Sequence, residues 1–194
     1  RLKEKVMADI CGKPMLQHVW ERVKKAHEVD EVIIACDKER VLKAAEAFGA
    51  RCVFTSPDHP SGTDRISEVA GSVDADVYIN VQADEPMISP LMIDQLAQVY
   101  SYEKNVQMAT LIKRIDKAED INDPNVVKVV VDRKGFALYF SRSPIPYMRR
   151  SYDQSGEINS AEGEVTGGYY KHIGLYSYTK DFLFTYRNLP RSVL

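Results

Sequence analysis

The residues best placed to do chemistry follow an apolar run that ends at Val81. They read Gln82-Ala83-Asp84-Glu85-Pro86. A carboxylate at the C-terminal end of a strand, beside an open cleft, can hold a Mg²⁺ ion that bridges nucleotide phosphates. Position alone supports an alternative equally well, namely a turn in which Asp84 caps the next helix. Asp84 is therefore the first candidate for a metal ligand.

A second candidate segment is the loop Ser61-Gly62-Thr63-Asp64-Arg65, which opens a helix. Backbone N–H groups at such a helix start could receive an oxyanion or the carbonyl of a base. The plainer interpretation is that Ser61 is an ordinary N-cap and Arg65 a solvated helix residue. The residue types alone favour the plainer one.

Lys5 and Lys13 flank the segment 6–10. A lysine near a glycine turn can neutralise phosphate as a compact point charge, but two lysines among 26 basic residues are a weak signal. Neither a GxxxxGK[ST] phosphate loop nor a GxGxxG dinucleotide fingerprint is present, so an NAD-dependent enzyme is a poor fit.

Arg142 and His172 are candidates in the second half of the chain. Arg142 follows a β-rich segment and His172 lies within another, so the two could bind the carboxylate and hydroxyls of a small acid. The alternative for His172 is a histidine satisfied within the core. The four histidines are scattered and do not form a zinc site, and no Ser/His/Asp arrangement is evident.

These candidates need elements to position them, and the first half of the chain alternates helix and strand patterns. Helices are expected from Pro14, over 41–48, around 66–70 and from Ser89 to about Tyr102, with strands at 32–36, 51–55 and 76–81. The later β-rich segments are 106–113, 126–131, 136–141 and 170–178, with a hairpin turn at 132–135 and a long polar loop at 147–168.

This order predicts an α/β fold with a mostly parallel central sheet, helices on both faces and an antiparallel β extension. Ligands bind outside the carboxyl ends of the strands of such sheets. Chemistry is therefore expected in the loops that begin at Asp37, Ser56 and Gln82.

Composition limits the classes of partner. The 194 residues are 44% hydrophobic and 28% charged with a net charge of −2, which fits one globular domain over residues 1–194 and argues against nucleic acid as a partner. No apolar run approaches the roughly 20 residues of a membrane span, and no signal peptide is evident. Three cysteines without Cys-x-x-Cys spacing suggest a reducing, cytoplasmic location.

Taken together, the motifs resemble those of the 3-deoxy-manno-octulosonate cytidylyltransferase (CMP-Kdo synthetase) family. The matching segments follow the family's order along nearly the whole chain. They are Asp9–Met15 with His18–Arg22, Asp58–Arg65, Asn80–Pro86, Asp123–Val130, Ala137–Arg142 and Lys171–Tyr176.

The resemblance implies a nucleotide-diphospho-sugar transferase type of fold and the reaction CTP + Kdo → CMP-Kdo + diphosphate, with Mg²⁺ as cofactor. It further implies a role in lipopolysaccharide synthesis and a homodimer. Residue by residue, it implies that Asp84 is a catalytic magnesium ligand and that Lys5 is catalytic and faces the triphosphate. By the same resemblance the nucleotide is held by Ser61, Gly62, Arg65 and Gln82, and the Kdo side of the cleft by Arg142, His172 and Tyr176.

The sequence also departs from the family pattern. Glu4 and Ala83 stand where the family has glycines, and Ala83 would be strained if that backbone needed a positive φ. The chain is expected to lack the family's first strand and its C-terminal segment. Two other functions stay open: a cytidylyltransferase for 8-amino-Kdo or sialic acid, and a catalytically silent nucleotide-binding module.

Overall fold

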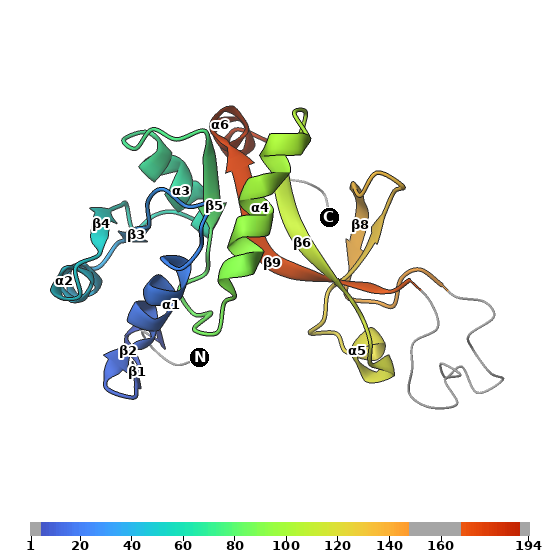
Figure 1. Cartoon of the computed structure of the whole chain (residues 1–194), viewed down its shortest axis with the longest axis horizontal. Helices are drawn as coiled ribbons and strands as arrows, with labels where there is room; N and C mark the ends of the chain where they lie inside the picture. The colour runs from blue at the N-terminus through green and yellow to red at the C-terminus, as the bar shows by residue number, and fades with distance from the viewer. Residues whose placement is uncertain (1–4, 148–167, 191–194) are drawn as a thin grey trace. The chain divides into compact units, whose positions relative to one another are not determined.

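The computed structural model describes residues 5–147 and 168–190 (Figure 1). The predicted loop 147–168 lies almost wholly outside these residues, and so does Glu4. The chain divides into two compact units, one built from residues 1–109 and 175–194 and the other from residues 110–174. The single domain expected over residues 1–194 stays a prediction, because one domain can contain two packing units.

The first unit contains most of the helices. Its elements are η1 (Lys5–Met7), β1 (Asp9–Ile10), β2 (Lys13–Pro14), α1 (Met15–Val23), β3 (Ile33–Cys36), α2 (Glu39–Ala47), β4 (Arg51–Phe54), α3 (Gly62–Ala70), β5 (Val77–Asn80), α4 (Pro90–Tyr102) and α6 (Lys180–Arg187). The expected helices and strands of residues 14–102 are all present, and α6 was not predicted.

Strands β3 and β4 pair in parallel, from Ile33 opposite Arg51 to Cys36 opposite Phe54. Such a pair needs a crossover element, and α2 supplies it. Helix α2 packs its apolar stripe against these strands around Val41 and Ala45.

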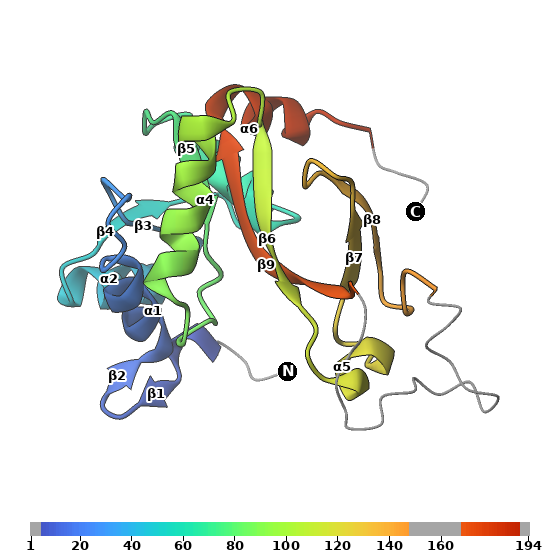
Figure 2. The same ribbon diagram turned by 45° about the vertical axis from the view of Figure 1, so that its right-hand side comes forward.

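The second sheet is antiparallel where it joins β5 to β9 (Tyr170–Thr179), with Asn80 opposite Tyr176. Tyr78 and Tyr178 face α3 and α6, where they form a buried cluster with Leu183. On the other face, α4 contacts β5, and its Tyr100 hydroxyl donates to Ser177 Oγ at 3.0 Å (Figure 2). Helices therefore cover both faces of this strand pair, as expected.

The second unit is a small β structure. Its remaining elements are α5 (Ala118–Asn122), β7 (Lys128–Val131) and β8 (Ala137–Ser141), and it shares β9 and β6 (Met108–Arg114) with the first unit. Strands β7 and β8 form the predicted hairpin, and β7 also pairs antiparallel with the start of β9. The α/β class and the antiparallel extension are confirmed, and parallel pairing is confirmed for β3 and β4.

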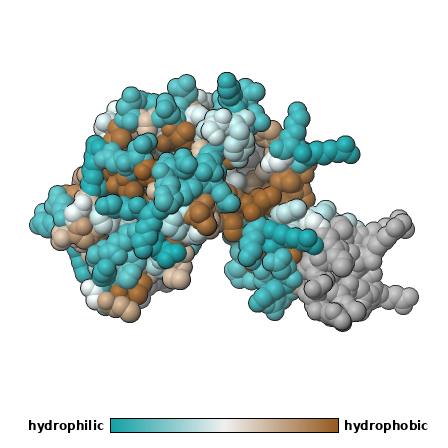
Figure 3. Space-filling model, viewed as in Figure 1, coloured by the Kyte–Doolittle hydropathy of each residue, from teal (hydrophilic) through white to brown (hydrophobic). Residues whose placement is uncertain are grey.

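Strand β8 is exposed along most of its length. Leu138, Tyr139 and Phe140 each leave 42% or more of their surface open. Figure 3 shows hydrophobic side chains gathered over this hairpin. Large apolar side chains exposed on a strand at the end of a sheet mark a site that favours association.

Candidate functional site

Polar residues gather at the carboxyl ends of the strands in the first unit. Asp37 follows β3, Thr55 follows β4 and Asn80 ends β5. Thr55 and Asn80 are buried, so the side chains of these residues must find partners within the protein. The loops expected to carry chemistry begin at these strand ends.

Arg65 of α3 ties two of the strand ends together. Its guanidinium donates to Asp37 Oδ2 at 3.0 Å and to Thr55 Oγ1 at 2.5 Å. The side chain is only 20% exposed, so the alternative of a solvated helix residue is wrong. The contacts show that Arg65 fixes the start of α3 against β3 and β4, whereas its role in nucleotide binding stays a prediction.

The start of α3 lies against two carboxamide side chains. Ser61 Oγ accepts the backbone N–H of Asp64 at 3.2 Å, which confirms Ser61 as the N-cap. A Cβ atom added at Gly62 would lie 3.5 Å from Asn80 Nδ2 and 3.7 Å from Gln82 Nε2. The structure therefore brings Ser61, Gly62 and Gln82 together, as the predicted nucleotide site requires.

Asp84 lies in the loop that follows the carboxyl end of β5. It forms an ion pair with Lys5, 79 positions earlier in the sequence. The two side chains are 31% and 54% exposed, so the carboxylate is accessible to a ligand. The N-cap of α4 is Ser89, so the alternative in which Asp84 caps that helix is wrong. The two residues predicted to be catalytic are in contact.

Ala83 adopts an ordinary backbone conformation. Within residues 5–147 and 168–190, Cys11 is the one non-glycine residue with a positive φ. Ala83 also packs against the cluster around Leu16 and Ile34. The replacement of the family's glycine therefore carries no backbone strain.

The residues around Asp84 can be tested for their fit to a magnesium ion. The described residues contain no group of three or more His, Cys, Asp or Glu side chains that could hold a metal ion. Mg²⁺ in nucleotide enzymes is commonly held by one or two carboxylates together with substrate phosphates. Asp84 supplies one accessible carboxylate, so this donor set fits a metal ion that is shared with a phosphate.

Tyr176 lies within the first unit, directly opposite Asn80 in the β5–β9 pair. Its ring stacks on that of Tyr178, with centroids 6.3 Å apart, and burial raises the pKa of the Tyr176 hydroxyl. The Tyr178 hydroxyl lies 3.2 Å from Thr63 Oγ1 at the start of α3. Tyr176 is thus adjacent to the predicted nucleotide residues.

Arg142 and His172 lie in the second unit. His172 Nε2 is 2.9 Å from Thr110 Oγ1, and that hydroxyl donates to the carbonyl of Ile173 at 3.0 Å. Because the hydroxyl proton of Thr110 is used toward Ile173, the hydrogen bond between Thr110 and His172 must be donated by His172 Nε2. Burial lowers the pKa of His172, which favours the neutral ring. Arg142 is exposed and donates to the carbonyl of Pro124 at 2.6 Å.

Lys13, the weakest of the sequence candidates, is held by Glu21. Its ammonium group lies 2.7 Å from Glu21 Oε1, and this hydrogen bond lowers the pKa of the Glu21 carboxyl. The half-buried pair fixes β2 to α1. This local partner supports a structural role for Lys13.

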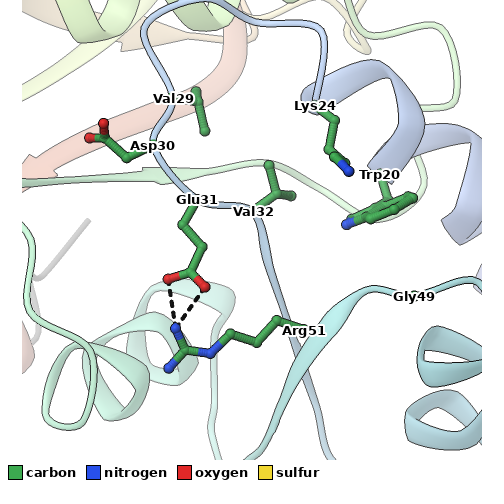
Figure 4. Close-up of a pocket in the computed structure, with 8 residues that line it drawn as sticks. All are labelled: Trp20, Lys24, Val29, Asp30, Glu31, Val32, Gly49 and Arg51. Carbon is green, nitrogen blue, oxygen red and sulfur yellow. Dashed lines mark hydrogen bonds and ion pairs between the residues drawn. The ribbon is translucent and has the colours of Figure 1, made fainter.

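A separate hollow of about 260 Å³ lies at the opposite ends of β3 and β4 (Figure 4). Its lining includes Glu31 and Val32, which precede β3, and Arg51, which begins β4. Arg51 Nη1 donates to both carboxylate oxygens of Glu31, at 2.7 and 2.6 Å. The hollow contains none of the predicted site residues and opens at the amino ends of the strands, so it is not the candidate site.

Three residues of the site, Asp37, Thr55 and Asn80, were not among the candidate site residues predicted from the sequence. Each is a polar residue at the end of an apolar strand, and the loops that follow all three strands were expected to carry chemistry. A polar residue within an otherwise buried run was the signal that could have identified Asn80. The partners of Asp37 and Thr55 depend on Arg65, a tertiary contact that spacing does not encode.

An α/β unit with a carboxylate, a lysine and a helix N-terminus at its strand ends is typical of proteins that bind nucleotides at that edge of the sheet. Comparison with known proteins makes this more specific. A sequence model of the family described as "Cytidylyltransferase" matches residues 1–194.

Two relatives, both 3-deoxy-manno-octulosonate cytidylyltransferases, come from Geobacter sulfurreducens and Geobacter metallireducens. They are 45% and 49% identical to this chain, and the matches cover all of it and 77% and 76% of the relatives. A solved structure of CMP:2-keto-3-deoxy-manno-octonic acid synthetase complexed with CTP superposes with a TM-score of 0.87 at 45% identity. That match covers 100% of this chain and 74% of the other. This chain therefore belongs to the 3-deoxy-manno-octulosonate cytidylyltransferase family.

Proposed function

We propose that this chain activates Kdo by the reaction CTP + Kdo → CMP-Kdo + diphosphate, which supplies a precursor of lipopolysaccharide. The observation that carries the proposal is the contact between Lys5 and Asp84, two positions after Gln82, which lies beside the start of α3. It places a cation and an accessible carboxylate where a triphosphate and its metal ion would both find a partner. Similarity to the relatives and to the CTP complex supports the same reaction.

In the proposed reaction the anomeric hydroxyl of Kdo attacks the α-phosphorus of CTP. A bond forms between that oxygen and phosphorus, the bond to the bridging oxygen breaks, and diphosphate leaves while the hydroxyl proton is released. Positioning and charge neutralisation dominate such transfers, so the protein has little covalent chemistry to perform.

The residues of the first unit have distinct parts in this proposal. Lys5 balances negative charge on the departing diphosphate. The first turn of α3 presents backbone N–H groups that have no acceptor within the helix, at Gly62 and Thr63. The carboxamide of Gln82 stands beside Gly62 and can contact the base, and Arg65 keeps these parts in register.

Asp84 is the residue that would hold Mg²⁺. When bound, this ion supplies positive charge that polarises the phosphate. In the second unit, Arg142 offers a planar donor fork that suits the carboxylate of a sugar acid, and the neutral His172 ring can exchange hydrogen bonds with hydroxyls.

The decisive experiment measures diphosphate release from each of the four nucleoside triphosphates, with Kdo and with or without Mg²⁺. Of the four nucleoside triphosphates, we expect CTP to be the one that releases diphosphate in the presence of Kdo. We expect this release when Mg²⁺ is present and none when it is left out. Kdo, 8-amino-Kdo and sialic acid in competition separate the related cytidylyltransferases. Calorimetric binding of CTP without diphosphate release would instead establish the silent nucleotide-binding module.

We also propose that the chain forms a homodimer through the exposed apolar side chains of β8, including Leu138 and Phe140. Light scattering of the purified protein and of a Leu138→Glu variant tests this. A monomeric parent chain would contradict it.

None of the helices in the described part of the chain is long and apolar enough to cross a membrane. The cytoplasmic location stays a prediction.

A further inference from the structure

The segment Asp123–Lys128 contains a fully buried lysine for which the proposed reaction has no use. The Lys128 side chain is 0% exposed, and burial lowers the pKa of its ammonium group. A buried charge is costly unless every donor finds a partner. The partners of the Lys128 ammonium group therefore indicate what this buried lysine does.

The ammonium group of Lys128 holds the turn that precedes it. Its Nζ donates to the carbonyl of Asp123 at 2.9 Å and to the carbonyl of Val126 at 2.7 Å. The turn itself is closed by the N–H of Val126, which donates to the carbonyl of Asp123 at 3.1 Å. The Asn125 N–H donates to Asp123 Oδ1 at 2.8 Å. Lys128 thus fixes the directions of two carbonyls that flank Pro124.

The carbonyl between them binds the residue predicted to recognise the sugar acid. Arg142 Nη1 donates to the carbonyl of Pro124 at 2.6 Å. Ser141, the residue before Arg142, lies directly opposite Lys128 in the β7–β8 pair. The strand pairing and the turn therefore connect Lys128 to the Arg142 guanidinium from two directions, and all of these contacts lie within the second unit.

We propose that Lys128 is a positioning residue for Kdo recognition: it fixes the Asp123–Val126 turn so that the Pro124 carbonyl holds the Arg142 guanidinium toward the sugar carboxylate. This inference rests on the proposed function, and on Arg142 as the carboxylate partner. A bidentate contact between arginine and a carboxylate depends strongly on orientation, because both N–H groups must align with both oxygens. Loosening the turn should weaken Kdo binding far more than CTP binding.

The test is a double-mutant cycle with Lys128→Met and Arg142→Ala in the full chain. Lys128→Met keeps the volume of the side chain and removes the charge. We expect it to raise the KM for Kdo about tenfold, with the KM for CTP changed less than about twofold. Arg142→Ala should raise the KM for Kdo at least as much. The double variant should match Arg142→Ala alone, because Lys128 acts through Arg142. Lys117→Met, at an exposed lysine of the same unit, is the matched control and should leave both KM values unchanged.

The outcomes separate two failures. If Arg142→Ala leaves the KM for Kdo unchanged, the assigned role of Arg142 is wrong and the inference falls with it. If Arg142→Ala raises that KM while Lys128→Met does not, or if the two effects add, the inference alone is overturned. Should Lys128→Met fail to fold, Lys128→Gln decides by the same criteria. Failure of both to fold would assign Lys128 a purely structural role and overturn the proposal.

Discussion

At the scale of single residues, the contact between Lys5 and Asp84 links two charges that local sequence alone would treat separately. Each charge compensates the other, and both are accessible enough to exchange partners. In the proposed reaction, a triphosphate would offer Lys5 a more highly charged partner, and a metal ion would do the same for Asp84. Under the proposed function, both charges of the ion pair would therefore find partners in the substrate and its metal ion.

Asp84→Asn tests the carboxylate directly. The amide keeps the shape of the side chain and loses the charge that would hold Mg²⁺. We expect kcat to fall by about 100-fold or more, with CTP affinity changed only a fewfold, because the loss concerns the transition state. Diphosphate release gives kcat, and calorimetry gives the affinity. Glu85→Gln, at an exposed neighbouring carboxylate, is the control, and a near-normal kcat in Asp84→Asn would remove Asp84 from the mechanism.

The stability of the protein should depend on pH through His172. Burial lowers the pKa of this ring below its ordinary 6.5 in the folded chain. The folded state then binds fewer protons than the unfolded state at mildly acid pH. The contribution of His172 to stability is fully present above about pH 6.5 and is lost as the pH falls toward the lowered pKa.

Urea unfolding at about pH 7.5 and about pH 5.5 checks this, with His172→Gln as the comparison. The parent chain should lose more free energy of unfolding between the two values than the variant, since glutamine does not titrate. Equal losses in both proteins would show that the ring is not responsible.

At the scale of elements, the sequence predicted those whose signals are local. Helices α1 and α4 carry a proline near their start and an apolar stripe along one face. Two helices, α5 and α6, were not predicted. Helix α5 has five residues, and α6 begins at Lys180, directly after β9 ends at Thr179, the N-cap of α6. The β-rich pattern of 170–178 gave no signal for that change.

In the candidate site, too, the residues with local sequence signals were predicted and the long-range contacts were not. Ser61, Gly62 and Gln82 are motif residues near strand ends, and the structure places them together. The clamp formed by Arg65 on Asp37 and Thr55 joins three elements, and its hydrogen bonds exist only once those elements have packed. Residue types cannot distinguish such an arginine from a solvated one.

Helix α2 allows a test of its C-terminal cap. Gly49 has a φ of +79°, and a Cβ atom added there would meet nothing within 4 Å. Gly49→Ala should therefore cost about 1–2 kcal/mol of stability through backbone strain alone. Gly174 in β9 is equally open and lacks the positive φ, so Gly174→Ala should be neutral or stabilising. Chemical denaturation of both variants measures the difference, and equal effects would rule out the backbone as the cause.

At the scale of the whole molecule, the predicted residues divide between the two packing units. Lys5, Arg65 and Asp84 belong to the unit with the parallel strands, while Arg142 and His172 belong to the unit with the hairpin. Tyr176 falls in the first unit, opposite Asn80, although the family resemblance assigned it to the sugar. KM values for CTP and for Kdo can show whether residues of the first unit recognise one substrate and residues of the second unit the other.

Gln82→Ala and Arg142→Ala provide that comparison. Gln82 stands beside the start of α3, so its loss should raise the KM for CTP about tenfold and leave the KM for Kdo within about twofold. Arg142→Ala should do the reverse, because a guanidinium offers its fork to a carboxylate rather than to the base. Gln98→Ala, on the exposed face of α4, controls for the loss of a glutamine. If Gln82→Ala raised the KM for Kdo more than that for CTP, the first unit could not be the one that recognises the nucleotide.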